Sequence, residues 1–236
     1  KLKDDLPSDF SDLVKLILNL TGRVIVSGVG KSGHIGNKIA ATLASTGTPA
    51  YFVHATEASH GDLGMITEQD LCLLISNSGE TIEMFNILTH ARRFSIPIAT
   101  MSSNCESTLV KAANFKLCLP MVDEACPIGM APTTSTTMML ALGDALAVAL
   151  MEAKSFNAEN FKVFHPGGKL GAKLMTVSQL MHKDDTMPLV KTDTSMKETL
   201  LTMSTKGFGI AAIVDEIGSL VGVITDGDLR RHIDDL

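Results

Sequence analysis

A glycine-rich segment lies between an apolar run and a helical pattern near the start of the chain. It reads Ser27-Gly28-Val29-Gly30-Lys31-Ser32-Gly33. The first N–H groups of a helix have no partner within the helix, and the helix dipole is positive at that end, so an anion is stabilised there. A purely structural lysine is poorly placed beside a positive helix end, and Lys31 therefore predicts an anionic partner.

Two common anionic ligands do not suit this segment. Its glycines satisfy the G-x-G-x-x-G spacing of dinucleotide-binding folds, but the acidic residue expected after the second strand is replaced by Val53-His54-Ala55. The triplet Gly30-Lys31-Ser32 resembles the end of a P-loop, but Ile25 stands where that loop needs its first glycine. A nicotinamide dinucleotide is disfavoured, and a nucleoside triphosphate is excluded.

A second polar loop again separates an apolar run from a helical pattern. It reads Ser76-Asn77-Ser78-Gly79-Glu80-Thr81 and offers three hydroxyls beside the free N–H groups of a helix start. Hydroxyls and amides can satisfy the terminal oxygens of one phosphate monoester without a metal, and Gly79 lets the backbone come close. Serine and threonine are also favoured there simply as helix caps. Two such loops in successive strand–helix units favour a phosphate site.

The elements that must position these loops follow from the pattern over residues 23–156. Short β-branched runs alternate with helical patterns, which is typical of a parallel sheet covered by helices on both faces. The predicted strands are 24–27, 50–53, 71–75, 98–101 and 115–119. The predicted helices are 8–20, 32–45, 81–94, 106–112 and 133–154. We therefore expect an α/β fold with a doubly wound, five-stranded parallel sheet in an αβα sandwich.

The rest of the chain predicts a linker and a second, smaller α/β unit. Pro166 and the three glycines after it exclude a regular helix or strand. We assign 1–160 to the first domain, 161–176 to a linker that carries His165, and 177–236 to the second unit. Within the second unit the pattern predicts a strand, a helix at 195–206, strands at 210–214 and 220–224, and a helix at 227–233.

The composition excludes several classes of partner. The formal net charge is −6, with one Tyr and no Trp, so neither a basic stripe nor a stacking surface predicts nucleic-acid binding. Apolar segments are interrupted before the roughly 18 residues that a membrane span needs, and no secretory signal opens the chain, so a cytoplasmic protein is expected. The four cysteines form no C-x-x-C pair and are expected to be reduced packing residues.

The two loops resemble those of the sugar isomerase (SIS) domain, and three further segments make the chain similar to the arabinose 5-phosphate isomerases. These segments are Ala58-Ser59-His60-Gly61-Asp62-Leu63-Gly64, the run 124–135 and His165-Pro166-Gly167-Gly168. The resemblance covers nearly the whole chain. It implies that D-arabinose 5-phosphate and D-ribulose 5-phosphate are interconverted through a cis-enediol, as the first step of Kdo biosynthesis for lipopolysaccharide or capsule. The alternative function is a non-catalytic SIS module that senses a phosphosugar.

The resemblance also implies roles for individual residues. Catalytic relevance is implied for Lys31, Glu83, Glu124 and His165. Substrate contacts are implied for Gly47, Thr48, His54, His60, Ser32, Ser76, Asn77, Ser78 and Thr81. From the residues alone, Glu83 is equally well explained as an acid in a first helical turn, Glu124 as a solvated loop acid and His165 as an exposed histidine. With the resemblance, Glu83 becomes the leading base and His165 the alternative.

The expected chemistry requires no cofactor, because an enediol route moves a proton with a base. His54 and His60 are six residues apart, which is not a regular metal motif. The resemblance implies that zinc binds at His54 and inhibits. It also implies a homotetramer whose active sites lie near subunit boundaries.

The segment 222–231 resembles the signature of a CBS module, in which Thr225 and Asp228 would contact a nucleotide. A capped helix after a strand is the alternative explanation. CBS modules work in pairs, and 177–236 holds a single repeat, so nucleotide regulation by this chain alone is not expected.

Overall fold

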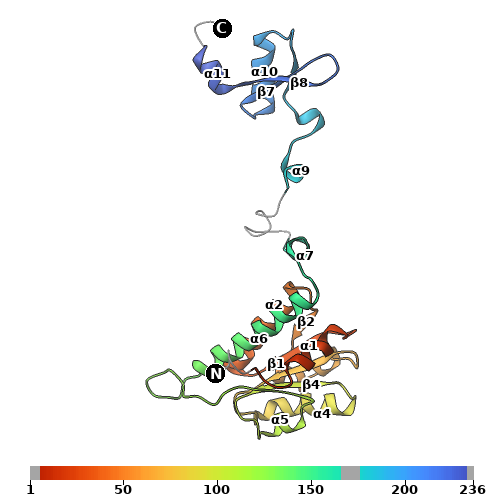
Figure 1. The fold of residues 1–236 in the computed structure, drawn as a ribbon, viewed down its shortest axis with the longest axis vertical. Helices are drawn as coiled ribbons and strands as arrows, with labels where there is room; N and C mark the ends of the chain where they lie inside the picture. Colours follow the sequence, from red (N-terminus) through yellow and green to blue (C-terminus); the bar gives the residue numbers. More distant parts are fainter. Residues whose placement is uncertain (1–5, 166–175, 233–236) are drawn as a thin grey trace. The chain divides into compact units, whose positions relative to one another are not determined.

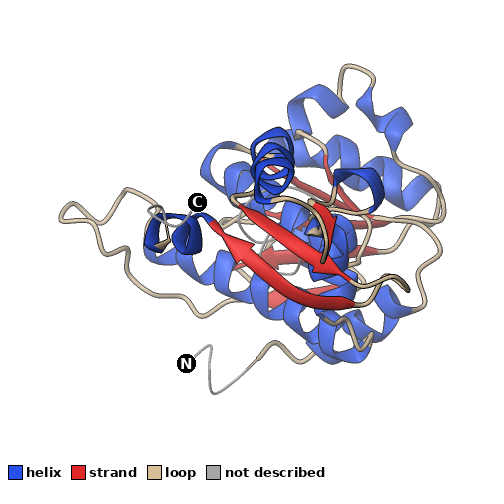
Figure 2. Cartoon of the chain, turned by 90° about the horizontal axis from the view of Figure 1, so that it is seen from above, coloured by secondary structure: helices blue, strands red, loops and turns tan. Residues whose placement is uncertain are grey.

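The computed structural model describes residues 6–165 and 176–232. The chain divides into two compact units, unit 1 (Lys1–Leu174) and unit 2 (Met175–Leu236), and each is described by itself. Figures 1 and 2 show the helices and strands of both.

Unit 1 contains a parallel sheet of five strands in the order β2-β1-β3-β4-β5. The strands are β1 (Val24–Gly28), β2 (Ala50–Phe52), β3 (Leu71–Ile75), β4 (Ile98–Ser102) and β5 (Phe115–Cys118). Every pairing in this sheet is parallel, and β1 lies between β2 and β3. The predicted doubly wound, five-stranded sheet is therefore confirmed.

Helices cover both faces of the sheet because alternate strand residues point to opposite faces and both sets are apolar. Val24 and Val26 belong to one core cluster, whereas Ile25 belongs to the other. The first cluster joins the sheet to α1 (Phe10–Leu18), α2 (Gly30–Ser45) and α6 (Thr134–Ala153). The second joins it to α3 (Ala55–Ala58), α4 (Phe85–Arg93) and α5 (Thr108–Ala112), of which α4 and α5 are seen on the other side of the sheet in Figure 1.

Helices α2 and α6 pack closely along their whole length. A side chain at Gly143 would overlap Ile39, since an added Cβ would lie 2.3 Å from Ile39 Cδ1. Ser32, in the first turn of α2, contacts Met139 near the start of α6. At the far end, Lys154 Nζ donates to Gly47 O at 2.9 Å. The two helices therefore run parallel and begin at the same edge of the sheet.

Helix α6 has the length and apolar composition of a membrane span. Its apolar run is nevertheless interrupted by Gly143 and Asp144, as the sequence indicates. The composition has a structural cause, because α6 residues including Met139, Leu142, Leu146 and Leu150 are buried in the first core cluster. Its outer face still carries Val148, which is 59% exposed.

Three local predictions are corrected. The predicted helix 81–94 begins with a 3-10 turn, η2 (Ile82–Met84), and only then continues as α4. Helix α7 (Ala158–Phe164) extends into the predicted linker 161–176, of which 166–175 lies outside the described residues.

Cys105 and Cys118 form a disulfide with Cα atoms 5.6 Å apart, so they are not reduced packing residues. Their proximity arises because β4 and β5 are neighbours and end together. Cys72 and Cys126 are free.

Unit 2 is a small α/β unit around a three-stranded sheet. The 3-10 helix η3 (Asp184–Thr186) follows the short helix α9 (Val177–Leu180). The sheet order is β6-β7-β8, with the first pair parallel and the second antiparallel. The elements after η3 are β6 (Leu189–Lys191), α10 (Met196–Lys206), β7 (Ile210–Val214), β8 (Leu220–Thr225) and α11 (Asp226–Arg231). The order strand, helix, strand, strand, helix matches the prediction.

A buried ion pair joins the starts of β1 and β3. Asp70 Oδ1 accepts from Arg23 N at 2.7 Å, and Asp70 Oδ2 lies 3.0 Å from Arg23 Nη2. Thr67 N also donates to Asp70 Oδ2, at 2.8 Å. The Asp70 side chain is fully buried. Burial raises its pKa, but the hydrogen bonds from Arg23 and Thr67 outweigh burial and lower the pKa overall, which keeps the carboxylate charged.

Replacing Asp70 with asparagine should lower the free energy of unfolding by about 3 kcal/mol, because a partly buried guanidinium loses its counter-charge. Urea denaturation followed by circular dichroism measures the change. The control is Asp12→Asn, which breaks the exposed Asp12–Lys15 pair and should change stability by less than about 0.5 kcal/mol. Equal effects of the two substitutions would show that the buried pair does not stabilise the sheet.

Candidate active site

The two predicted loops meet at the centre of the sheet. Strands β1 and β3 pair directly, and their last residues, Gly28 and Ile75, are in register. From β1 the chain passes through α2 to β2 on one side, whereas from β3 it passes through α4 to β4 on the other. The carboxyl ends of two such strands border the crevice in which open α/β sheets bind ligands. The glycine loop (residues 27–33) and the serine loop (residues 76–81) both lie at this edge.

The hydroxyls of the serine loop are hydrogen-bonded to the loop's own backbone. Ser76 Oγ accepts from Gly79 N at 3.0 Å and lies 2.8 Å from Thr81 Oγ1. Ser78 Oγ accepts from Glu80 N at 3.2 Å. Gly79 has a φ of +67°, which favours glycine. Phosphate oxygens can replace the hydroxyls as acceptors for these N–H groups, while the hydroxyls turn to donate.

A neighbouring segment after β4 supports the serine loop. Ser102 Oγ donates to Asn77 O at 3.0 Å, and Ser103 Oγ donates to Asn77 Oδ1 at 2.8 Å. Glu80 Oε1 accepts from Thr108 N, at the start of α5, at 2.8 Å. These supporting residues were not predicted from the sequence. The signal that could have identified them is the Ser102-Ser103 pair at the carboxyl end of a strand.

The helix starts at this edge differ in how their N–H groups are satisfied. Helices α5 and α6 receive carboxylate oxygens from Glu80 and Glu124. In contrast, the N-cap residue of α2 is Val29, which has no polar side chain, and Thr81 makes no side-chain cap for η2. Among the described residues, the helix starts at the glycine loop and at the serine loop therefore have no side-chain cap. This is the arrangement expected where a ligand anion supplies the missing acceptor.

Several predicted site residues surround these loops. Lys31 is exposed in the first turn of α2, and Ser32 contacts Met139. Glu83 is exposed on η2. The structure therefore places an ammonium group and a carboxylate on the two helix starts that border the crevice. Their catalytic roles stay predictions.

The two histidines flank α3, whose C-terminal end contacts α4 through Ser59. His54 follows β2 and its Nδ1 accepts from Thr56 N at 3.3 Å, so the ring caps α3. His60 is exposed after α3, and Asn86 Nδ2 on α4 donates to Ser59 Oγ at 2.6 Å. The described residues contain no cluster of three His, Cys, Asp or Glu that could hold a metal ion. Zinc at His54 stays a prediction.

Glu124 has a definite position at the start of α6. Its Oε2 accepts from Thr133 N at 2.7 Å and from Ser135 N at 3.3 Å, and Ser135 Oγ donates to Oε1. The hydrogen bonds from the Ser135 hydroxyl and the Thr133 N–H lower the pKa of Glu124 to about 2. A carboxylate held in this way is a weak base, which favours Glu83 or His165 for proton transfer.

Three predicted residues lie at the other end of unit 1. Lys154 Nζ, beyond the end of α6, donates to Gly47 O and to Thr48 Oγ1. His165 follows α7, where its ring stacks on Phe161 with centroids 3.7 Å apart and its Nδ1 lies 2.9 Å from Phe161 O. Because α6 has 20 residues, it is about 30 Å long. The structure therefore does not bring Gly47, Thr48 or His165 to the two loops of the same chain.

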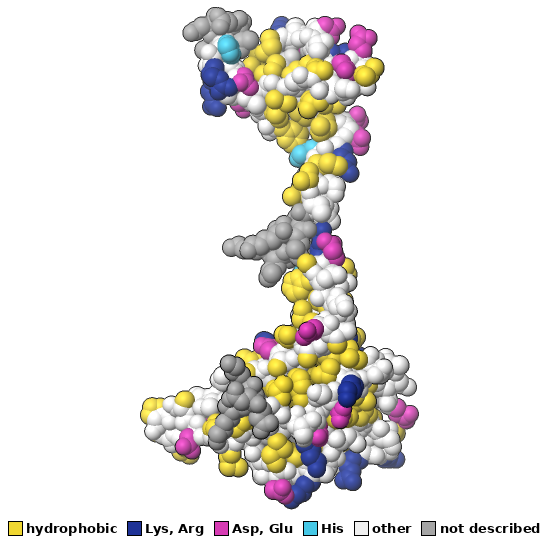
Figure 3. Space-filling model, in the orientation of Figure 1, with side chains coloured by type: hydrophobic (Ala, Val, Ile, Leu, Met, Phe, Trp, Pro, Cys, Tyr) yellow, Lys and Arg dark blue, Asp and Glu magenta, His cyan; other side chains and the backbone are white. Residues whose placement is uncertain are grey.

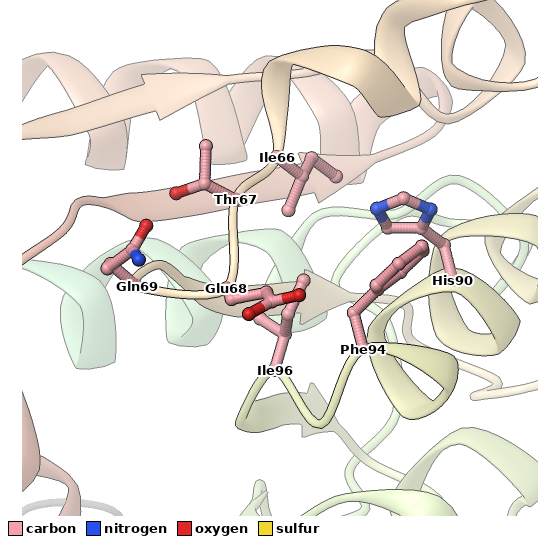
Figure 4. Close-up of a pocket in the computed structure, with 7 residues that line it drawn as sticks. All are labelled: Ile66, Thr67, Glu68, Gln69, His90, Phe94 and Ile96. Carbon is pink, nitrogen blue, oxygen red and sulfur yellow. The ribbon is translucent and has the colours of Figure 1, made fainter.

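A cavity of about 320 Å³ lies away from this site (Figure 4). It is lined by the segment before β3 and the end of α4, including Glu68, His90 and Phe94. These segments adjoin the amino edge of the parallel sheet, opposite the two loops. The cavity is therefore not the predicted phosphate site.

In unit 2, Thr225 and Asp228 bond to each other. Thr225 Oγ1 accepts from Asp228 N at 3.3 Å and donates to Asp228 Oδ2 at 2.7 Å. Hydrogen bonds from the Thr225 hydroxyl and N–H, and from Arg231, lower the pKa of Asp228 to about 2. The segment 222–231 is therefore a strand followed by a capped helix, which is the alternative explanation given for it from the sequence. A nucleotide contact stays a prediction.

Comparison with known proteins gives matches over both units. Residues 17–149 match the model of the SIS domain, and residues 177–235 match that of the CBS domain. The chain is 52% identical over 235 residues to arabinose 5-phosphate isomerase KdsD of Yersinia pestis, covering 99% of this chain and 72% of that protein. It is 52% identical over 227 residues to KdsD of Pseudomonas aeruginosa, covering 96% and 70%. The chain thus spans about 70% of the length of these relatives.

A solved structure from E. coli CFT073, in complex with arabinose 5-phosphate, has a similar fold. It superposes with a TM-score of 0.68 at 42% sequence identity and covers 70% of this chain and 88% of its own.

Replacing Glu124 with glutamine should destabilise the protein at pH 7 and flatten its acid denaturation. The folded-state pKa of about 2 is below the ordinary 4.5, so the carboxylate stabilises the fold above the unfolded-state pKa and this stability is lost as pH falls toward 2. Melting temperatures between pH 7 and pH 3 measure the effect. The control is Asp123→Asn, whose exposed carboxylate has no described hydrogen bond. Parallel pH profiles for Glu124→Gln and the wild type would contradict the assignment.

Proposed function

Since the chain belongs to the family of SIS-domain arabinose 5-phosphate isomerases, we propose that it interconverts D-arabinose 5-phosphate and D-ribulose 5-phosphate. The observation that carries the proposal is the 52% identity to a named isomerase over 99% of the chain. The similar structure that contains arabinose 5-phosphate supports a sugar phosphate ligand for the same fold. Both favour an enzyme over the alternative of a phosphosugar-sensing regulatory module.

The geometry of the two loops accounts for phosphate recognition. The helix starts at the glycine and serine loops present N–H groups without side-chain caps, and the serine loop adds the hydroxyls of Ser76, Ser78 and Thr81. Neutral donors of this kind bind a dianion and leave its charge partly uncompensated. Lys31, on the first turn of α2, is placed to neutralise the remaining charge or that of an enediolate.

The reaction requires a base that removes the C2 proton of the aldose and returns a proton to C1. Glu83 stands two residues after the serine loop, so a sugar held there by its phosphate lies within reach of a carboxylate on the next turn. Removal of the C2 proton gives a cis-enediolate with its charge on O1; a proton then passes from O2 to O1, and a proton delivered to C1 completes the ketose. Glu124, whose pKa is lowered to about 2, is better suited to holding the start of α6 than to proton transfer. No cofactor enters this route.

The exposure of the site within one chain supports a shared active site in a homotetramer. Ile82, next to Glu83, is 79% exposed, and Lys31 and Glu83 are also exposed. An enediolate needs shielding from water, which one chain does not provide at this edge. His165, Gly47 and Thr48 lie at the other end of unit 1, from where they can complete a neighbouring subunit's site. Figure 3 shows hydrophobic side chains gathered on unit 1, and Val148 and Tyr51 are more than half exposed.

The proposal extends to the setting of the enzyme. The relatives carry the name KdsD, which agrees with a first step in Kdo biosynthesis for lipopolysaccharide or capsule. A cytoplasmic location suits an enzyme that acts on a charged phosphosugar. Zinc bound to the His54 ring, which caps α3, would inhibit the enzyme.

The purified chain should convert arabinose 5-phosphate to ribulose 5-phosphate faster than it converts other pentose and hexose phosphates. In deuterated water the ribulose 5-phosphate should carry deuterium at C1, because the base can exchange its proton with solvent; NMR reads both product and label. Turnover without deuterium, lost with a chelator and restored by a metal ion, would contradict the metal-free enediol route. Absence of turnover with every sugar phosphate would favour the sensing module.

Replacing Glu83 with glutamine should leave folding unchanged and reduce kcat by about 100-fold or more, the scale of general base catalysis. The matched control is Glu152→Gln, an exposed carboxylate in the last turn of α6, which should leave kcat unchanged. Steady-state kinetics with arabinose 5-phosphate measure both. Near-normal turnover of Glu83→Gln would transfer the role of base to His165.

A further inference from the structure

Ser107 is a buried polar residue directly behind the serine loop. Its side chain is 1% exposed, and among the described residues its hydroxyl oxygen has no hydrogen-bond partner. A buried hydroxyl without a partner is unfavourable, so its retention calls for an explanation.

The hydroxyl lacks a partner because the serine loop has taken over its usual task. Ser107 precedes α5, where a serine normally accepts from the N–H groups of the first turn. Here Thr108 N donates to Glu80 Oε1 at 2.8 Å, and Leu109 N donates to Gly79 O at 3.2 Å. Two serine-loop residues therefore cap α5, and the Ser107 hydroxyl is left over.

The same hydroxyl is in close contact with the middle of the serine loop. A Cβ added to Gly79 would lie 1.9 Å from Ser107 Oγ and 3.1 Å from Ser102 Oγ, so only glycine fits between the two hydroxyls and the loop. Gly79 N donates to Ser76 Oγ at 3.0 Å, which makes this peptide one of the proposed phosphate donors. Any change in the hydrogen bonds of Gly79 on phosphate binding therefore takes place in contact with the Ser107 hydroxyl.

We infer that Ser107 is a positioning residue for the substrate phosphate. When phosphate oxygens accept from Gly79 N, the serine loop exchanges its internal hydrogen bonds for bonds to the ligand. The Ser107 hydroxyl then donates to Gly79 O, whose second lone pair is available beside the bond from Leu109 N. The Ser107 hydroxyl, which is buried without a partner in the free protein, thereby gains a hydrogen bond in the complex. This inference rests on the proposed function, because it requires a phosphate at the serine loop.

The test is Ser107→Ala in the whole chain, with two measurements. The melting temperature of the free protein should stay the same or rise, since an unpartnered hydroxyl is removed. The KM for arabinose 5-phosphate should rise by about 2- to 10-fold, the range of one neutral hydrogen bond, with kcat little changed. Ser107→Cys, which keeps a weak donor, should give an intermediate KM.

The matched control is Thr100→Val. Thr100 is fully buried, and its Oγ1 donates to Leu109 O on α5 at 3.3 Å. Because this hydroxyl has a partner in the free protein, its removal should lower the melting temperature and leave KM unchanged. A structural role for Ser107 would give this same pattern.

The outcomes separate the two claims. A lower melting temperature with unchanged KM for Ser107→Ala, while the wild type is active, overturns the role of Ser107 and leaves the isomerase assignment standing. Wild-type protein that neither turns over any sugar phosphate nor gains melting temperature with inorganic phosphate overturns both. If Ser107→Ala does not fold, the hydroxyl is structural, and a wild-type KM for Ser107→Cys confirms that the inference is wrong.

Discussion

The pairing of β1 with β3 is the contact on which the arrangement of the site depends. These strands are separated in the chain by α2, β2 and α3, yet they pair in register from Val24 with Leu71 to Gly28 with Ile75. Because parallel strands end at the same edge, this single pairing brings the glycine loop and the serine loop together. The buried Arg23–Asp70 pair links the starts of the same two strands. One edge of this strand pair thus supports the fold, and the other presents the loops.

The helix starts that follow β1, β3, β4 and β5 divide into two kinds. At α5 and α6 the chain supplies its own carboxylates, Glu80 and Glu124, so the positive end of each helix is already compensated. At the glycine and serine loops no side chain caps the helix start. Acidic residues at these helix starts therefore have different tasks. Glu80 and Glu124 satisfy the protein's own N–H groups, whereas Glu83 is exposed and makes no described hydrogen bond.

The close packing of α2 against α6 determines which residues lie far from the site. Gly143 lets the helices approach at Ile39, and the helices run parallel, so α6 leads from Glu124 at one edge of the sheet to Lys154 at the other. Gly47, Thr48 and His165 belong to that second end. The separation within one chain is the physical reason for proposing that subunits share their active sites.

Much of this protein follows from local sequence patterns. Buried strands read as continuous apolar runs, helix starts read as glycine and hydroxyl segments, and both loops were found at the strand ends where the structure places them. The 3-10 turn at Ile82–Met84 and the disulfide between Cys105 and Cys118 were not predicted. These features depend on which strands and helices become neighbours, and that depends on contacts between residues distant in sequence. The same reason applies to Glu124. The local pattern describes it as a solvated acid, but in the tertiary structure it caps a helix that begins ten residues later. The sequence by itself determined the elements and the chemistry of the loops; only the tertiary structure decided which carboxylates are already hydrogen-bonded and which remain free to act.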